Sequence, residues 1–181
     1  MLNGHTALVT GSTQGIGLAI AQAMARAGAD IVMHGIEPVA QGEAIAAELA
    51  AANAVRAAYV RANLAEAGEA EGLVAAATAA LRHPDILANN AGIQYTCPIE
   101  SFPLERWNAI IAVNLTAAFL AMKAAVPGMR ERGWGRIVNI ASVHGLVASI
   151  HKGAYLAAKH GLVGLSKGVA LETATQGITV N

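Results

Sequence analysis

Three residues in the last third of the chain have the types and spacing of a proton-transfer site. Tyr155 and Lys159 are four positions apart, and Ser142 precedes them in the sequence. If the segment is helical, residues at i and i+4 lie about 5–6 Å apart, so an ammonium group stands beside a phenol. A nearby cation favours the phenolate and lowers a pKa that is about 10 in free tyrosine. The spacing favours a tyrosine that exchanges protons, and the alternative for two residues alone is a surface pair.

A glycine-rich turn near the N-terminus predicts a dinucleotide site. Gly11, Gly15 and Gly17 follow a strand-like run and open a helix-like one, which is the context that such a turn requires. The first glycine permits the turn, the second lets the backbone approach a pyrophosphate, and the third allows close packing of helix on strand. The helix N-terminus adds N–H groups and a positive dipole end. The alternative is a plain structural turn.

The choice of dinucleotide depends on the end of the second predicted strand. Glu37 lies there, about 20 positions after Gly17, where a carboxylate can hold the ribose 2′-hydroxyl of NAD. Because Pro38 follows it, this carboxylate can equally well be a solvated loop residue. A 2′-phosphate would need a basic neighbour, and between Ser12 and Pro38 the sequence offers only Arg26, inside the first predicted helix. We therefore expect NAD rather than NADP.

The alternation of strand-like and helix-like runs predicts the architecture. Apolar or β-branched runs predict strands at residues 6–10, 30–34, 55–61, 85–89 and 136–141. Ala-rich runs with helical periodicity predict helices at residues 15–27, 38–52, 65–82, 103–132 and 153–175. This order implies right-handed crossovers and a mostly parallel sheet covered on both faces. The predicted fold is therefore a doubly wound, Rossmann-like α/β domain.

Composition narrows the classes of function. The 181 residues suffice for one domain with its own core, so residues 1–181 are expected to form a single dinucleotide-binding catalytic domain. Twelve basic residues balance twelve acidic ones, which gives no electrostatic footprint for nucleic acid or an anionic membrane. Cys97 is the only cysteine, which excludes an intrachain disulfide and favours a cytoplasmic location.

Neither a metal centre nor a membrane segment is expected. The six histidines are scattered without the spacing of metal ligands. The longest apolar stretch, residues 109–129, is interrupted by Asn114, Lys123 and Pro127, whereas a membrane helix needs about 20 predominantly apolar residues. Residues 1–5 lack a charged start followed by an apolar signal core. We expect a buried helix and no targeting segment.

Taken in chain order, these motifs resemble the short-chain dehydrogenase/reductase family in its shorter form. The residues that carry the resemblance are the glycine turn, Asn89, Asn90, Ala91 and Gly92 after the fourth strand, then Asn114, Ser142, Tyr155 and Lys159. The resemblance implies NAD(P)-dependent oxidoreduction of an alcohol or carbonyl by a homotetramer. It implies that Tyr155 is the general acid/base and that Lys159 lowers its pKa and holds the nicotinamide ribose. Ser142 would bind the substrate oxygen and Asn114 a relay water, although Asn114 can also be structural.

The resemblance also implies a set of cofactor-binding residues. They are Gly11, Thr13, Gly15, Ile16, Gly17, Ile36, Asn63, Leu64, Asn90, Gly92, Tyr155 and Lys159. Asn90 is expected to brace the central strand near the cofactor. Asn63 departs from the family, which usually has Asp at this position, but an amide can still donate and accept hydrogen bonds.

A closer similarity, to family members that act on a short 3-hydroxy acid, lies in residues 90–94 and 133–149 and at Lys152. It implies that Gln94, His144 and Lys152 bind a substrate carboxylate while Ser142 and Tyr155 engage the 3-oxygen. A cation and two donors suit a carboxylate. Taken singly, these three residues can instead be a surface Gln, a packing or capping His and a solvated loop Lys. A sugar, a steroid or a thioester-bound ketoacyl group remains an alternative substrate.

Residues 177–181 have the pattern of a turn and the opening of a sixth strand. The family continues with the rest of this strand, a segment that covers the substrate and a last strand used in assembly. The sequence therefore predicts a domain truncated at its C-terminal end, in which water is excluded less well. A second hypothesis follows, that of a fragment which binds a dinucleotide without turnover.

Overall fold

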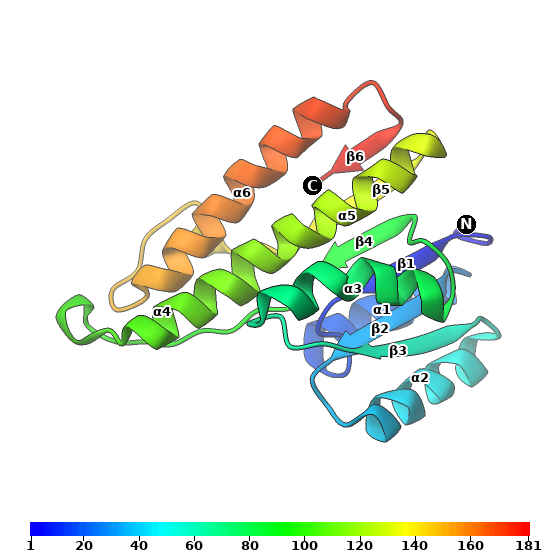
Figure 1. Ribbon diagram of the computed structural model, residues 1–181, viewed down its shortest axis with the longest axis horizontal. Helices are drawn as coiled ribbons and strands as arrows, with labels where there is room; N and C mark the ends of the chain where they lie inside the picture. The colour runs from blue at the N-terminus through cyan, green and yellow to red at the C-terminus, as the bar shows by residue number, and fades with distance from the viewer.

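The computed structural model describes residues 1–181 and contains one six-stranded sheet with helices on both faces (Figure 1). The strands are β1 (Thr6–Val9), β2 (Asp30–Gly35), β3 (Ala57–Arg61), β4 (Ile86–Asn89), β5 (Gly135–Asn139) and β6 (Ile178–Val180). Their order in the sheet is β3-β2-β1-β4-β5-β6, and every neighbouring pair is parallel. The predicted doubly wound α/β architecture is confirmed, and the sixth strand does begin near residue 178.

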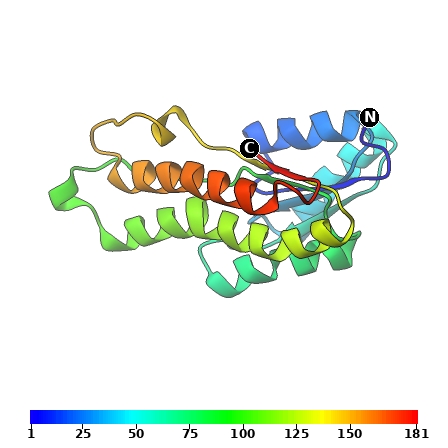
Figure 2. The ribbon, with the colours of Figure 1, turned by 90° about the horizontal axis from the view of Figure 1, so that it is seen from above.

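The helices cover the sheet as two layers. They are α1 (Gly15–Arg26), α2 (Val39–Asn53), α3 (Ala67–Ala80), α4 (Leu104–Ile111), α5 (Ala117–Glu131) and α6 (Gly153–Thr173). Figure 2 shows α1 on one side of the sheet and α3 and α5 on the other. Because the chain leaves β1 and β4 toward opposite faces, a crevice forms where the carboxyl ends of these neighbouring strands meet, which is the usual ligand position in such sheets.

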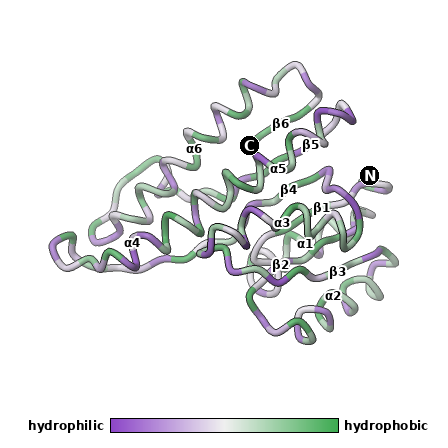
Figure 3. The backbone as a smooth tube through the Cα atoms, viewed as in Figure 1, coloured by the Kyte–Doolittle hydropathy of each residue, from purple (hydrophilic) through white to green (hydrophobic).

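Two hydrophobic cores lie on the two faces of the sheet. The larger has 17 buried residues and joins Leu8 and Leu87 of the sheet to Leu73 of α3 and Met122 of α5. The smaller has 11 buried residues, among them Val9, and includes side chains of α1 and α2. Leu8 and Val9 lie in opposite cores because successive side chains of a strand point to opposite faces. Figure 3 shows apolar, green stretches along the strands and the helices.

The helix predicted at residues 103–132 is interrupted by a π-helical turn. The turn is formed by Ala112–Thr116 and separates α4 from α5. The whole segment Leu104–Glu131 has 28 residues and the length and hydropathy of a membrane-spanning helix. Its buried side chains, such as Ala121 and Met122, belong to the larger core, as expected of a core helix. The sequence prediction did not include the π turn, which is a rare single-turn feature inside α-helices.

The third predicted strand is two residues too long at its start. Strand β3 begins at Ala57 rather than at residue 55. Helix α2 is followed by Ala54 in the left-handed conformation, with φ +54°. Arg56 is then turned toward Asp30, whose carboxylate accepts hydrogen bonds from the Arg56 backbone N–H at 2.9 Å and from Nη2 at 2.6 Å. The Arg56 N–H is thus bound by a side chain, while the Arg56 carbonyl accepts from the Ile31 N–H at 2.9 Å.

Candidate active site

A cleft of about 490 Å³ opens at the carboxyl ends of β1, β2 and β4. Nine of the predicted cofactor residues line it: Gly11, Thr13, Ile16, Gly17, Ile36, Asn63, Leu64, Asn90 and Gly92. The sequence prediction missed the other lining residues, which are Gln14, His34, Gly35, Ala65, Ala91, Ile93 and Val113, and left Glu37 undecided. Most of them lie within two residues of the end of a predicted element, which is the signal that could have found them, whereas Val113 lies inside the helix predicted at residues 103–132 and carries no such signal.

The glycine turn has the geometry that a bound pyrophosphate needs. Gly11 has φ +61° and Gly15 has φ +54°, a backbone region that favours glycine. A Cβ at Gly15 would meet nothing within 4 Å, so the backbone is open on that side. A Cβ at Gly17 would lie 2.0 Å from the carbonyl oxygen of Gly11 and 2.5 Å from Nδ2 of Asn90. The turn thus fits the dinucleotide, with Gly17 needed for close packing and Gly15 for close approach.

Asn90 fastens this turn to the central strand β4, as predicted. Its Nδ2 donates to the carbonyl oxygens of Thr10 at 2.9 Å and of Gly11 at 3.0 Å. The hydroxyl of Thr10 in turn accepts hydrogen bonds from the backbone N–H groups of Asn90 and Ala91, both at 2.9 Å. These four hydrogen bonds add to the backbone bond from the Thr10 N–H to the Ala88 carbonyl at 3.0 Å and join the carboxyl ends of β1 and β4.

Glu37 lines the cleft instead of pointing into solvent. Its Oε1 accepts a hydrogen bond from the Thr13 hydroxyl at 2.7 Å, and the Tyr59 hydroxyl lies 3.4 Å from Oε2. Burial alone would raise the pKa of Glu37, but hydrogen bonds donated by Thr13, by the backbone and by Tyr59 bring this pKa below its ordinary value. The cleft therefore carries an ionised carboxylate at the end of β2.

Tyr155 and Lys159 lie on one face of α6, as their spacing predicted. Nζ of Lys159 is 5.6 Å from the centre of the Tyr155 ring. The same Nζ donates to the carbonyl oxygen of Ile140 at 2.6 Å, and Lys159 is only 4% exposed. Burial lowers the pKa of Lys159. The ammonium has three donors and Ile140 takes one, which leaves two for other groups near the phenol.

Ser142 and His144 stand beside Tyr155 on the turn that follows β5. The Ser142 hydroxyl accepts a hydrogen bond from the His144 backbone N–H at 3.2 Å and thereby caps a short 3₁₀ turn, Val143–Gly145. Oγ of Ser142 lies 3.5 Å from Nδ1 of His144, and the His144 ring lies edge-on to the Tyr155 ring at 6.0 Å. Nε2 of His144 is buried without a protein hydrogen-bond partner. A polar substrate is a suitable partner for such an atom.

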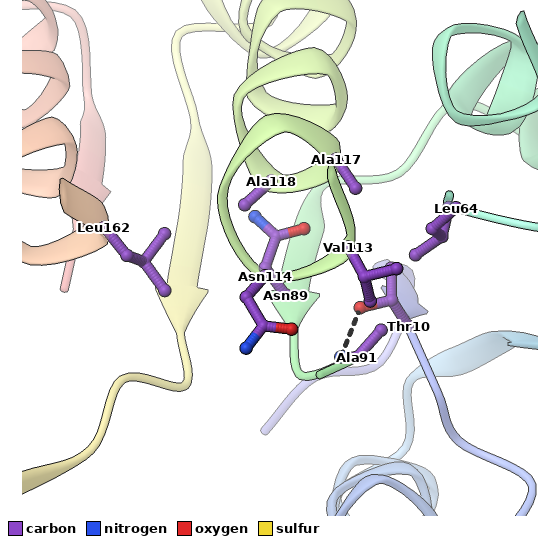
Figure 4. Close-up of a pocket in the computed structure, with 9 residues that line it drawn as sticks. All are labelled: Thr10, Leu64, Asn89, Ala91, Val113, Asn114, Ala117, Ala118 and Leu162. Atoms are coloured by element: carbon purple, nitrogen blue, oxygen red, sulfur yellow. Dashed lines mark hydrogen bonds between the residues drawn. The ribbon is translucent and has the colours of Figure 1, made fainter. Parts of the chain in front are cut away.

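Asn114 occupies the π-helical turn, and both polar atoms of its side chain bind the backbone of Ile93. Oδ1 accepts from the backbone N–H of Ile93 at 2.8 Å, and Nδ2 donates to the Ile93 carbonyl at 2.9 Å. The structural role considered for this residue is therefore present, and it fixes the loop that follows β4. Asn114 also borders a small cavity of about 10 Å³ (Figure 4). A cavity of this size is about as large as one water molecule, so the relay role stays a prediction.

The other two predicted substrate residues lie on the loops that flank this cluster. Lys152 is the residue just before α6 begins, three positions ahead of Tyr155. Gln94 is exposed on the loop after β4. The two loops are joined where the Cys97 backbone N–H donates to the His151 carbonyl at 2.8 Å. The structure thus brings Ser142, His144, Tyr155 and Lys159 together and places Gln94 and Lys152 on the two joined loops.

Comparison with known proteins agrees with this geometry. The model of the short chain dehydrogenase family matches residues 5–181, so the chain belongs to this family. A D-beta-hydroxybutyrate dehydrogenase of Cupriavidus necator is 53% identical over 100% of this chain and 69% of that protein. A protein of the same name from Rhizobium meliloti is 48% identical over 97% of this chain and 68% of its own length.

A solved structure of the same fold carries a dinucleotide. It is a putative NAD(P) dependent gluconate 5-dehydrogenase from Beutenbergia cavernae with bound NADP at low occupancy. Its TM-score is 0.92 at 39% identity, over 99% of this chain and 71% of that one. This chain therefore belongs to a family of oxidoreductases that bind a nicotinamide dinucleotide.

Proposed function

We propose that the protein is an NAD-dependent dehydrogenase that interconverts D-3-hydroxybutyrate and acetoacetate. The observation that carries the proposal is the 53% identity, over the whole chain, to a D-beta-hydroxybutyrate dehydrogenase. The arrangement of Ser142, Tyr155 and Lys159 next to the dinucleotide cleft supports it. A gluconate 5-dehydrogenase is the second candidate, because a structure so described is 39% identical to this chain.

The proposed chemistry divides between the dinucleotide and the side chains. A nicotinamide ring supplies the hydride acceptor when it is bound. Tyr155 takes the proton from the substrate hydroxyl, which must leave if a carbonyl is to form. Lys159 places its Nζ 5.6 Å from the Tyr155 ring centre, beside the group that takes this proton. The Ser142 hydroxyl accepts from the His144 N–H at 3.2 Å, and its own hydrogen can be donated to the substrate oxygen in place of the long 3.5 Å contact with Nδ1 of His144.

The start of α6 is suited to a substrate carboxylate. Lys152 is its N-cap residue, and the 21-residue helix directs the positive end of its dipole toward the same place. His144 can donate from its unpartnered Nε2 in the tautomer that carries the proton there. A short hydroxy acid can reach these groups and Tyr155 together, because His144 and Tyr155 are neighbours.

Replacing Lys152 tests the substrate proposal. Loss of a hydrogen bond to a charged group costs about 1.5–3 kcal/mol, so Lys152→Ala is expected to raise KM for D-3-hydroxybutyrate about 10- to 100-fold. The KM for NAD should stay near the wild-type value. Steady-state kinetics measures both. Lys167→Ala, a change at an exposed lysine of the same helix, is the matched control and should leave both constants unchanged.

If Lys152→Ala keeps the wild-type KM for D-3-hydroxybutyrate, the carboxylate is bound elsewhere and the substrate assignment loses its support. Gluconate is assayed in parallel, and faster turnover of gluconate than of D-3-hydroxybutyrate would favour the second candidate.

We also propose that Glu37 selects NAD over NADP. Its ionised carboxylate sits at the end of β2, where a dinucleotide of this fold class places the adenosine ribose. Thr13 and Tyr59 hold it there, so it would accept from the ribose 2′-hydroxyl and repel a 2′-phosphate. Arg61, whose Nε donates to the Ile36 carbonyl at 3.2 Å, is the basic group that could favour NADP instead.

We expect Glu37→Gln to reduce the preference for NAD, measured as the ratio of kcat/KM values for NAD and NADP, by at least about tenfold. Removing the repulsion between the Glu37 carboxylate and the 2′-phosphate, in a half-buried site, is enough for this change. Glu43→Gln, at an exposed position of α2, serves as control. An unchanged ratio in Glu37→Gln, or a wild type that prefers NADP, would contradict this assignment.

A further inference from the structure

His34 is a buried residue of the cleft wall whose ring joins two elements of the dinucleotide site. It lies near the end of β2 and is 2% exposed. Nδ1 accepts a hydrogen bond from the Gly11 backbone N–H at 3.0 Å. Nε2 lies 3.0 Å from the carbonyl oxygen of Ala62, just after β3. Because the N–H can only donate and the carbonyl can only accept, both bonds require a neutral ring with its hydrogen on Nε2.

The backbone of His34 binds the same turn. Its N–H donates to Oγ of Ser12 at 3.0 Å, and its carbonyl accepts from the Ser12 N–H at 2.8 Å. On the opposite side, Asn90 holds the carbonyl of Gly11 at 3.0 Å. Gly11 is thus fixed at its N–H by His34 and at its carbonyl by Asn90. Its position matters, since that carbonyl packs directly against Gly17.

We propose that His34 is a positioning residue that holds the glycine-rich turn only while its imidazole is neutral, so that acidification weakens dinucleotide binding. Protonation would place a hydrogen on Nδ1, where it faces the N–H of Gly11 with no acceptor between them. The turn would lose this bond, and Gly11 and Ser12 would be held by fewer contacts. The inference rests on the proposed dinucleotide function of the cleft and adds a pH dependence to it.

The charges around His34 determine the direction of this effect. Burial lowers the pKa of His34, while the hydrogen bond to Ala62 and the charge of Glu37 raise it, and the balance lies below the ordinary value of 6.5. Glu37 faces the ring from the loop after β2, and Tyr59 and Arg61 belong to the neighbouring strand β3. The glycine turn, residues 10–17, contributes no titratable side chain.

The direction of the pH effect follows from the lowered pKa of His34. A histidine with a depressed pKa is neutral in the folded protein above about pH 6.5, so its contribution to the fold and to the turn is complete there. This contribution is lost as the pH falls below the ordinary pKa and then through the lowered one. The lowered pKa of Glu37 keeps that carboxylate ionised over the same range, so it should not produce the effect.

The test is the affinity for ADP-ribose between about pH 5 and pH 8, measured by titration calorimetry. ADP-ribose lacks the nicotinamide but keeps the ribose assigned to Lys159, so any effect of Lys159 titration would remain in the His34 variants, which keep this lysine. For the wild type we expect a constant Kd in the upper part of the pH range. As the pH falls further, the Kd should rise, with a slope that approaches about tenfold per pH unit. Circular dichroism at each pH confirms that the protein is folded.

Two variants separate titration from packing. His34→Asn keeps an oxygen acceptor near the position of Nδ1 but cannot titrate, so its Kd should be weaker than wild type by a few-fold and independent of pH. His34→Leu removes both ring bonds and should bind ADP-ribose weakly at every pH. A His34→Asn protein with the wild-type pH dependence would overturn the inference.

A second measurement applies even if the variants do not fold. Linkage requires that ADP-ribose lower the pKa of His34 if the neutral ring favours binding, and the ring resonances in NMR spectra of the wild type report this pKa. An unchanged His34 pKa would also overturn the inference. Absence of ADP-ribose binding by the wild type at about pH 8 would instead contradict the proposed dinucleotide function.

Discussion

Tyr155→Phe is expected to lower kcat for D-3-hydroxybutyrate oxidation by about 10²- to 10⁴-fold, the usual contribution of a positioned general acid/base. The change removes one oxygen and keeps the ring, which packs edge-on against His144. The hydrogen bond from Lys159 to the Ile140 carbonyl holds the lysine beside this phenol. The loss should therefore fall on the chemical step and leave the affinity for NADH within a few-fold of wild type.

Single-turnover kinetics with saturating cofactor measures the chemical step, and fluorescence titration measures NADH affinity. Tyr95→Phe is the matched control. Tyr95 is an exposed tyrosine whose ring lies against Phe102, and it is not one of the residues proposed to do the chemistry. A Tyr155→Phe protein that keeps the full rate would eliminate the proposed mechanism.

Gly17→Ala is expected to weaken dinucleotide binding about 5- to 150-fold, which corresponds to the 1–3 kcal/mol of an overpacked site. The new Cβ would lie 2.0 Å from the Gly11 carbonyl oxygen and 2.5 Å from Nδ2 of Asn90. Neither neighbour can move freely, because Asn90 also binds the Thr10 carbonyl and the N–H of Gly11 is bound to His34. The turn must therefore shift away from the position that receives the pyrophosphate.

Titration with NADH and thermal unfolding together test this prediction. Gly72→Ala in α3 is the control, because a Cβ there would meet nothing within 4 Å. The control should keep its affinity and gain about 0.5–1 kcal/mol of stability, as alanine replaces glycine inside a helix. Wild-type affinity in Gly17→Ala would show that the close contact is not required.

Local sequence signals were enough to predict the fold and the helix that carries Tyr155 and Lys159. The glycine turn, the strand and helix alternation and the four-residue spacing of Tyr155 and Lys159 each depend on residues close in sequence, and the structure has each of them. The continuation into β6 was also visible, because Ile178 and Val180 alternate with Thr179 as a half-buried strand requires.

Contacts between segments distant in sequence could not be predicted in the same way. In the sequence, His34 is a single histidine at the end of an apolar run. Only the folded chain shows that its ring reaches Gly11, which lies 23 positions away. The orientation of Glu37 depends on Thr13 and Tyr59 in the same manner. The π-helical turn at Asn114 depends on the reciprocal bonds with Ile93 on another loop.

The most direct test of the central proposal is the initial rate of NADH formation from the separate enantiomers of 3-hydroxybutyrate. The proposed function predicts turnover of the D enantiomer with NAD and a rate for the L enantiomer lower by at least about 100-fold. Equal rates with both enantiomers, or no D-specific rate in a preparation that binds NADH, would contradict it.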